Sequence, residues 1–184
     1  QNPNKITEIR AKLPDFTIEG LDPKVFPNEL LETGDTLEDN ALQKVRQVFE
    51  KTQASCFADD TGLEVDALDG KPGVYSARYA GEQRSSEDNM QLLLTNLDGE
   101  DNRKARFRTV IALILEGNEY TFEGICNGRI TTQKSGAEGF GYDPIFVPEG
   151  EERTFAEMSM DEKSIISHRG RAVDMLVNFL KELK

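Results

Sequence analysis

The chain has 184 residues, with 2 cysteines, 1 histidine and a formal net charge of −12 at pH 7. This length fits a single domain over residues 1–184, which can bury enough surface to fold without disulfides or a structural metal. We expect no nucleic-acid partner, because a strongly acidic surface repels phosphate backbones at long range. No apolar run is long enough to cross a bilayer, so we also expect no membrane partner.

The two cysteines favour a reducing compartment. Cys56 and Cys126 both lie in apolar contexts, and no C-x-x-C pair indicates a zinc site. Apolar surroundings of this kind are typical of buried thiols. Because disulfides are rare in reducing compartments, we expect a cytoplasmic protein with two free cysteines.

The N-terminal part predicts two helices joined by a long loop. Residues 2–13 predict the first helix, with Asn2 as N-cap and a proline at the favoured first position. Residues 14–36 are rich in Gly, Pro, Asp and Thr and predict a loop. Residues 35–53 predict the second helix, with Thr36 as its cap.

The second helix carries an apolar stripe, formed by Leu37, Ala41, Val45, Val48 and Phe49. Lys44 falls at the edge of this stripe. A long side chain there can carry its ammonium out to water, or it can point into a cleft. The sequence leaves both interpretations open.

Helices and strands alternate in the rest of the chain. The expected elements are, in order, a short strand over 55–60, a helix over 85–97, a strand over 104–115, one or two antiparallel strands over 118–131 and a strand over 143–148. Ser159 and Glu162 form a capping box that predicts another helix. The last helix starts after Ser167, with a stripe of Ala172, Met175, Leu176, Phe179, Leu180 and Leu183. This order indicates an α/β class with a mixed sheet.

Cations lie at helix N-termini, where anions are normally favoured. Lys5 falls in the first turn of the first helix, and His168 and Arg169 fall in the first turn of the last. Each placement is unfavourable by a few tenths of a kcal/mol unless an anion is nearby. Free N–H groups at a helix start also bind phosphate, so a bound anion is the simplest explanation. Taken by itself, His168 is better explained as an ordinary surface or cap residue.

Three acids fall near loops or strand ends: Glu32, Asp59 and Asp60. Carboxylates at the end of a strand in an α/β fold point to the crevice where ligands bind. Mg²⁺ is usually held by one or two carboxylates together with substrate phosphates, and it would relieve the repulsion between adjacent aspartates. A plain Asp-Asp-Thr-Gly turn is the alternative. The sequence has no P-loop and no nucleophile elbow.

Five segments, taken in order, resemble one family closely. They are NPNKITEI, ETGDTLEDNALQK, FADDTGLEVDALDGKPGVYSARYAG, FGYDPIFVP and EKSIISHRGRA. Together they resemble the Ham1-like inosine/xanthosine triphosphate pyrophosphatases, over nearly the whole chain. The family pattern has a strand before the turn that Gln1 and Asn2 match. The resemblance implies an α/β fold with a long mixed sheet flanked by helices, two lobes with a central cleft, and a homodimer.

The resemblance also implies an activity and a set of site residues. The activity is hydrolysis of ITP, dITP or XTP to the monophosphate and pyrophosphate, with Mg²⁺. Asp60 is implied as metal ligand and proton acceptor, with Glu32 and Asp59 helping at the metal and Thr61 contacting the substrate. Gln1, Asn2, Lys5, Lys44 and Lys163 match positions on the phosphate side. Phe140, Gly141, Tyr142, Asp143, His168 and Arg169 match positions around the nucleotide and its base.

Three other functions remain to be weighed. A haloacid-dehalogenase-like phosphatase also uses aspartates and Mg²⁺, but its motif needs aspartates two positions apart, whereas Asp59 and Asp60 are adjacent. A nucleotide sensor would bind the triphosphate without hydrolysing it, and binding alone needs no general base. A pyrophosphatase for modified pyrimidine nucleotides is the nearest enzymatic alternative. For the base itself, Arg169 is our candidate donor to the oxygen at position 6 of a deaminated purine.

Overall fold

The computed structural model describes residues 10, 13, 14 and 16–183. The first helix expected from the sequence therefore falls almost entirely outside the described residues, as do Gln1, Asn2 and Lys5. Residues 16–36 contain no helix or strand, which agrees with the predicted loop. Within the part of the chain that the structure describes, no helix is both long enough and apolar enough to span a membrane.

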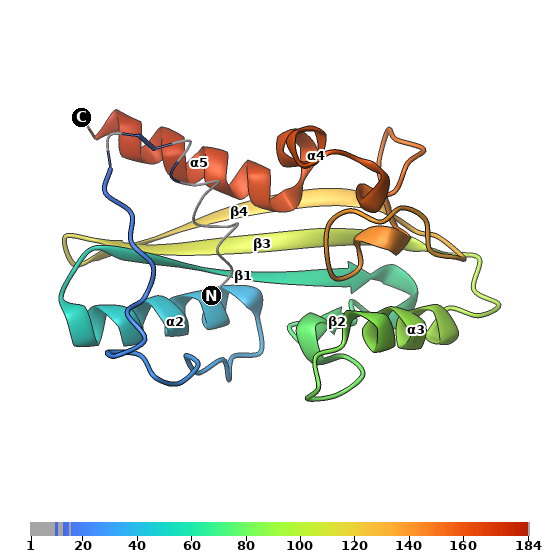
Figure 1. Ribbon diagram of the computed structural model, residues 1–184, viewed down its shortest axis with the longest axis horizontal. Coiled ribbons are helices and arrows are strands. Elements are labelled where there is room, and N and C mark those ends of the chain that lie inside the picture. Colours follow the sequence, from blue (N-terminus) through green and yellow to red (C-terminus); the bar gives the residue numbers. More distant parts are fainter. Residues whose placement is uncertain (1–9, 11–12, 15, 184) are drawn as a thin grey trace.

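Three long strands form the centre of one open sheet (Figure 1). They are β1 (Cys56–Val65), β3 (Lys104–Leu115) and β4 (Asn118–Ile130). Two short strands, β2 (Pro72–Gly73) and β5 (Phe146–Pro148), complete the order β2-β1-β3-β4-β5. The bounds of β3 agree with the sequence prediction, and residues 118–130 form one strand rather than two.

The sheet differs from the expected mixed sheet in its strand directions. Every neighbouring pair among the described strands is antiparallel. For β3 and β4 the reason is local: a tight turn at Glu116 and Gly117, with φ of 51° and 82°, joins them directly. Such a turn returns the chain beside itself and can only give an antiparallel pair. The α/β class itself is confirmed.

β1 is longer than the sequence predicts. It does not end at Asp59 and Asp60, because both residues pair with β3 in the middle of the strand. The strand continues to Leu63 and Val65, whose side chains are fully buried. The two carboxylates obscured this continuation, since charged residues are uncommon within a central strand.

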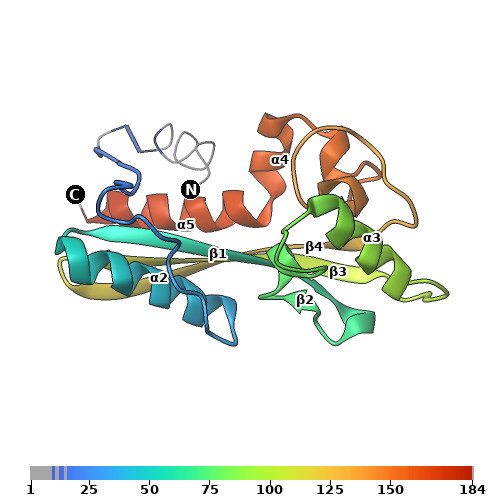
Figure 2. The same ribbon diagram turned by 60° about the horizontal axis from the view of Figure 1, so that its bottom comes forward.

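Helices cover both faces of one half of the sheet (Figures 1 and 2). α2 (Leu37–Thr52) begins at Thr36, which caps it as predicted, and α5 (His168–Glu182) is capped by Ser167. On the face under α2, Ala58 packs with the helix, whereas Phe57 packs on the opposite face with α5. Side chains of β1 therefore alternate between the two helices.

The other half of the sheet carries a separate core (Figure 2). α3 (Ser86–Asn96) and α4 (Met160–Ile166) lie near this half, and β5 adds to its edge. The core here includes Leu63, Val65, Met90, Leu93, Phe107, Ile130, Phe146 and Phe155. The long strands thus run through two lobes, as expected. The cleft between the lobes stays a prediction.

The first turn of α5 lies against β4 without intervening side chains. A Cβ atom added to Gly124 would be 1.9 Å from the backbone oxygen of His168. One added to Gly170 would be 1.8 Å from the backbone oxygen of Ser164. Both values are far below normal contact distances, so only glycine allows α5 to lie this close to β4 at Gly124 and to α4 at Gly170. The contact at Gly124 fixes the position of the first residues of α5 relative to the sheet.

The buried face of α5 differs in part from the predicted stripe. Met175 and Leu183 are 49% and 58% exposed, whereas Val173 and Val177 are buried. At 100° per residue, the buried side chains centre near Ala172 and Val173, which leaves Met175 beyond the edge. Leu183 lies past the last turn of the helix, where it caps the C-terminus.

Candidate active site

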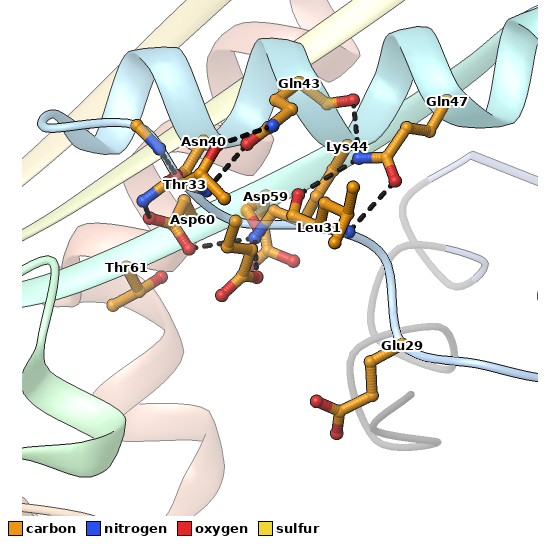
Figure 3. Close-up of polar contacts among 12 residues, drawn as sticks. Glu29, Leu31, Thr33, Asn40, Gln43, Lys44, Gln47, Asp59, Asp60 and Thr61 are labelled. Carbon is orange, nitrogen blue, oxygen red and sulfur yellow. Dashed lines mark hydrogen bonds and ion pairs between the residues drawn. The ribbon is translucent and has the colours of Figure 1, made fainter.

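Lys44 of α2 lies at the centre of a polar cluster beside β1 (Figure 3). Its Nζ donates to Glu32 Oε1 at 2.7 Å, to the backbone oxygen of Asp59 at 2.7 Å and to Asp60 Oδ1 at 2.8 Å. An ammonium can donate three hydrogen bonds, so all of them are used. The residue is only 9% exposed. Of the two interpretations of Lys44, the structure therefore supports the side chain that points inward.

Two carboxylates share this one ammonium. Burial acts to lower the pKa of Lys44, but the charges and hydrogen bonds of Asp60 and Glu32 outweigh it, so the pKa is raised and the ammonium stays charged. For Asp60, burial raises the pKa above its ordinary 3.8 and Glu32 adds to the rise, against the opposing effect of Lys44. A carboxylate with a raised pKa is a stronger base, which suits a proton acceptor.

Asn40 fixes the second oxygen of Asp60. Its Nδ2 donates to Asp60 Oδ2 at 3.3 Å, and its Oδ1 accepts from the Gly34 N–H at 2.8 Å. Asn40 is 2% exposed, so its amide is held in place by packing. The glycine is required, because a Cβ at Gly34 would lie 2.6 Å from the Cβ of Asp39.

Asp59 faces the other side of the sheet. Its Oδ2 lies 3.6 Å from Nε of Arg169, which belongs to α5. Neighbouring residues of a strand point to opposite faces, so the carboxylates of Asp59 and Asp60 cannot converge on one spot within β1. The expectation that the adjacent pair works together is not met in this arrangement. Their repulsion is instead reduced because each carboxylate lies near its own cation.

Thr61 belongs to the same face as Asp59. Its hydroxyl shares a 2.7 Å hydrogen bond with the hydroxyl of Thr109 on β3 and accepts from Arg169 Nη2 at 3.3 Å. Arg169 thus lies against two consecutive side chains on this face of β1. Its own side chain is 12% exposed.

A second cluster forms where the loop before β5 meets α4. The ammonium of Lys163 donates to Asp143 Oδ2, and the same oxygen accepts from the Phe140 N–H at 2.8 Å. Lys163 and Asp143 are both buried, whereas Phe140 is 53% exposed. The Phe140 ring centroid lies 5.1 Å from Lys163 Nζ and 5.7 Å from Arg169 Cζ. An exposed ring is therefore flanked by two cations.

Two of the remaining candidates at this cluster, Tyr142 and His168, are buried. Tyr142 is 5% exposed and its hydroxyl donates to the backbone oxygen of Ser76 at 2.9 Å. Burial raises the pKa of this phenol. His168 is 4% exposed and stacks on Phe107 with ring centroids 4.6 Å apart. Gly141 has a φ of +65°, which turns the chain between the exposed and the buried ring. Phe140 is therefore the ring that can stack on a base.

The structure thus sorts the candidate residues into sets. Glu32, Lys44 and Asp60 meet on the α2 side of β1, and Asp59, Thr61 and Arg169 meet on the other side. Arg169 in turn approaches the set formed by Phe140, Asp143 and Lys163. Lys163, predicted on the phosphate side, lies in this last set.

Sequence reasoning missed several residues of the α2 side, namely Asn40, Gln43 and Gln47. A signal was available, because with Lys44 they repeat at i, i+3, i+4 and i+7 and so share one helix face. Polar residues on a helix face are usually exposed, however, and only the position of the loop before α2 gives these a partner.

The oxygens around Lys44 suit a hard cation. Among the described residues no group of three or more His, Cys, Asp or Glu side chains is arranged to hold a metal ion. Two carboxylates, from Glu32 and Asp60, do converge on a single cationic atom. One or two carboxylates plus substrate phosphates are the usual Mg²⁺ ligands, so this donor set fits the ion.

Fold and site together define an α/β protein that holds a lysine between two carboxylates at the middle of an antiparallel sheet. The chain belongs to the Ham1 family, whose sequence profile matches residues 1–179.

Curated relatives and solved structures agree with this membership. The dITP/XTP pyrophosphatase of Flavobacterium johnsoniae is 52% identical over 184 residues, covering 100% of this chain and 96% of that protein. The dITP/XTP pyrophosphatase of Bacillus subtilis is 41% identical over 185 residues, with 98% and 93% covered. The Staphylococcus aureus Ham1 protein superposes with a TM-score of 0.94 at 39% identity, covering 100% of this chain and 96% of that one.

Proposed function

We propose that this protein hydrolyses deaminated purine nucleoside triphosphates (ITP, dITP and XTP) to the monophosphate and pyrophosphate, which removes them from the nucleotide pool. The observation that carries the proposal is the Asp60 carboxylate, only 13% exposed and held by Lys44 and Asn40. The membership of the chain in a family with relatives named dITP/XTP pyrophosphatases supports the choice of substrate.

Asp60 is the proton acceptor of the proposed reaction. Its carboxylate takes a proton from water as the water oxygen bonds to the α-phosphorus. The bond from this phosphorus to the oxygen that bridges it to the β-phosphorus breaks, and pyrophosphate leaves with that oxygen. Lys44 and Asn40 hold Asp60 in one orientation, and the Lys44 ammonium adds positive charge near the phosphates.

Mg²⁺ is the proposed cofactor, and Glu32 and Asp60 are the residues that would hold it. When bound, the ion neutralises phosphate charge and favours attack by water. Asp59 faces Arg169 rather than this pair, so we give it no direct place at the metal. Its expected effect on catalysis is correspondingly smaller.

We also propose that the protein is a homodimer and that it is cytoplasmic. A homodimer is what the family resemblance implies, and sedimentation equilibrium of the purified chain tests it. The free cysteines, Cys126 buried and Cys56 half-buried, are consistent with the cytoplasm.

A substrate panel tests the function directly. The protein is incubated with dITP, XTP, ITP, dATP and GTP in the presence of Mg²⁺, and pyrophosphate and orthophosphate are measured separately. We expect pyrophosphate from the deaminated purines and much slower turnover of dATP and GTP. Orthophosphate as the first product would indicate a phosphatase instead, and binding without turnover would indicate a sensor.

A matched pair of substitutions tests the role of the two aspartates. We expect Asp60→Asn to lower kcat by roughly 10²–10⁴-fold, because the general base is lost while the side-chain shape is kept. Asp59→Asn should cost much less, because Asp59 lies on the other face of β1. Circular dichroism checks that both variants fold. Equal losses in the two variants, or near-normal activity of Asp60→Asn, would contradict the assignment.

A further inference from the structure

The loop segment 31–34 is tied to α2 residue by residue (Figure 3). Gly34 is bonded by Asn40, Thr33 by Gln43, Glu32 by Lys44 and Leu31 by Gln47. The segment and the helix run in opposite directions, so successive loop residues meet successive side chains of one helix face. We refer to these four helix side chains as the α2 ladder.

The spacing of the ladder matches an extended chain. Seven helical steps, from Asn40 to Gln47, rise by roughly 10 Å at about 1.5 Å per step. Three extended steps, from Gly34 to Leu31, cover about the same distance at roughly 3.4 Å per residue. The spacing of the α2 ladder along the helix therefore matches the spacing of residues 31–34 in an extended conformation.

The two glutamines each make more than one bond to the segment. Gln43 Oε1 accepts from the Thr33 N–H at 2.8 Å, and its Nε2 donates to the Thr33 hydroxyl at 2.9 Å. Gln47 Oε1 accepts from the Leu31 N–H at 2.9 Å, and its Nε2 donates to the Leu31 backbone oxygen at 3.0 Å. The glutamines thus hold the backbone of Leu31 and of Thr33, the two neighbours of Glu32 in the chain.

Glu32 depends on this support because the loop has little other structure. Leu31 and Thr33 are exposed, and no helix or strand includes this part of the chain. The Glu32 side chain itself is 34% exposed and bonds Lys44 on one oxygen. Its carboxylate can therefore be displaced unless the backbone on both sides is fixed.

We propose that Gln43 and Gln47 are positioning residues that hold Glu32 against Lys44 and Asp60. Within the described part of the chain, the side chains of both glutamines hydrogen-bond residues 31 and 33 rather than Asp60 or Arg169, so they act through this loop segment. This inference rests on the proposed function only for its kinetic test. A misplacement of about 1 Å at a catalytic group can cost roughly 10²-fold in rate.

A double-substitution experiment tests the coupling to Glu32. We expect Gln43→Ala/Gln47→Ala to lower kcat/KM for dITP by roughly 10–100-fold and to raise the Mg²⁺ concentration needed for half-maximal rate. In a Glu32→Gln background the same pair should have almost no further effect, because the group that it positions is gone. A full, independent loss in that background would overturn the proposal.

Amide hydrogen exchange gives a readout that needs no activity. In the Gln43→Ala/Gln47→Ala variant, the amides of Leu31 and Thr33 should exchange much faster, while those of β3 stay protected. Gln91→Ala on α3 is the matched control, since Gln91 is exposed and its side-chain amide donates to Thr95 of the same helix. Unchanged exchange at both loop amides would overturn the ladder. If exchange responds but dITP is not hydrolysed even by the wild type, the proposed function fails and the ladder stands.

Two isosteric variants separate bonding from charge. Glu at position 43 can still accept from both the N–H and the hydroxyl of Thr33, so Gln43→Glu should retain most protection at Thr33. Glu at position 47 cannot donate to the Leu31 oxygen, so Gln47→Glu should lose protection at Leu31 and lower kcat/KM more. Both changes add one negative charge, and equal effects of the two would contradict the proposed bonds.

Discussion

At the scale of single residues, the burial of the Lys44 ammonium has a large effect on the stability of the site. Removing an ammonium from water is unfavourable by several kcal/mol, and only well-placed partners offset this cost. Lys44 has two carboxylates and a backbone oxygen within 2.8 Å. The same carboxylates need the ammonium, because without it two negative charges would face each other in a half-buried place.

We therefore expect Lys44→Met to destabilise the protein by about 3 kcal/mol at pH 7, since one partner of a buried pair is removed. The loss should shrink as the pH falls. Lys44 normally opposes the rise in the pKa of Asp60, so in the variant this pKa rises further and protonation of the folded state removes the uncompensated charge. Urea unfolding at pH 7 and pH 5 measures both effects.

Lys51→Met is the control for this substitution, because Lys51 is exposed near the end of the same helix. It should change stability by only a few tenths of a kcal/mol at either pH. A Lys44→Met variant as stable as the control at pH 7 would show that the cluster is solvated and contributes little.

The sequence could predict part of this site and not the rest. Lys44 could be singled out because it lies at the edge of an apolar stripe, and Glu32 and Asp60 because they fall near loops or strand ends and match the family segments. The side taken by Asp59 was not predictable, since it depends on β1 continuing past the carboxylates. Gln43 and Gln47 share a helix face with Lys44 in the sequence, but this spacing alone does not assign them a role, because their partner is the backbone of a loop whose course follows from the whole fold.

At the scale of elements, the strongest patterns were the best predicted. α2 was placed correctly because an apolar stripe follows a capping threonine, and β3 because it contains the long apolar run over residues 110–115. β5 is shorter than predicted, because residues 143–145 form a 3₁₀ turn and only Phe146–Pro148 pair with β4. Periodicity alone cannot separate a turn from a strand in so short a run.

α4 depends on its capping box, and its stability bears on the site because it carries Lys163. Ser159 Oγ accepts from the Glu162 N–H, and the Glu162 carboxylate accepts from the Ser159 N–H at 2.8 Å. The backbone and hydroxyl of Ser159, with help from Arg153, lower the pKa of Glu162 to about 2. A lowered pKa means that the ionised form is stabilised by folding.

We expect Glu162→Ala to lower the melting temperature at pH 7. A group with a depressed folded pKa contributes stability above its unfolded pKa of 4.5 and loses it as the pH falls toward about 2. The difference between wild type and variant should therefore narrow below pH 4.5. Asp161→Ala removes an acid from the same turn without a capping bond, so its effect should be smaller. A difference that widens on acidification would contradict the capping role.

At the scale of the whole molecule, α5 connects the parts of the site. Its first turn is held against β4 by the close approach at Gly124, so its start cannot shift relative to the sheet. From that turn Arg169 reaches Asp59 and Thr61 on β1 and the ring of Phe140 in the loop before β5. The residue thus lies between the central strand and the exposed aromatic ring.

This position makes Arg169 the candidate reader of the base. A deaminated purine carries an oxygen at position 6, where adenine carries an amino group, and a guanidinium can only donate. A mismatch of two donors in a desolvated site can discriminate by up to about 10⁴–10⁵-fold. We therefore expect Arg169→Ala to reduce the ratio of kcat/KM for dITP over dATP, with most of the change in the dITP value. Asp59→Asn removes the negative charge beside Arg169 but keeps the guanidinium donors, so it should leave most of the dITP-over-dATP preference intact. If the wild type prefers dITP and Arg169→Ala keeps that preference, another residue reads the base. The exposed ring of Phe140 and the buried Lys163 beside it would then be the next candidates.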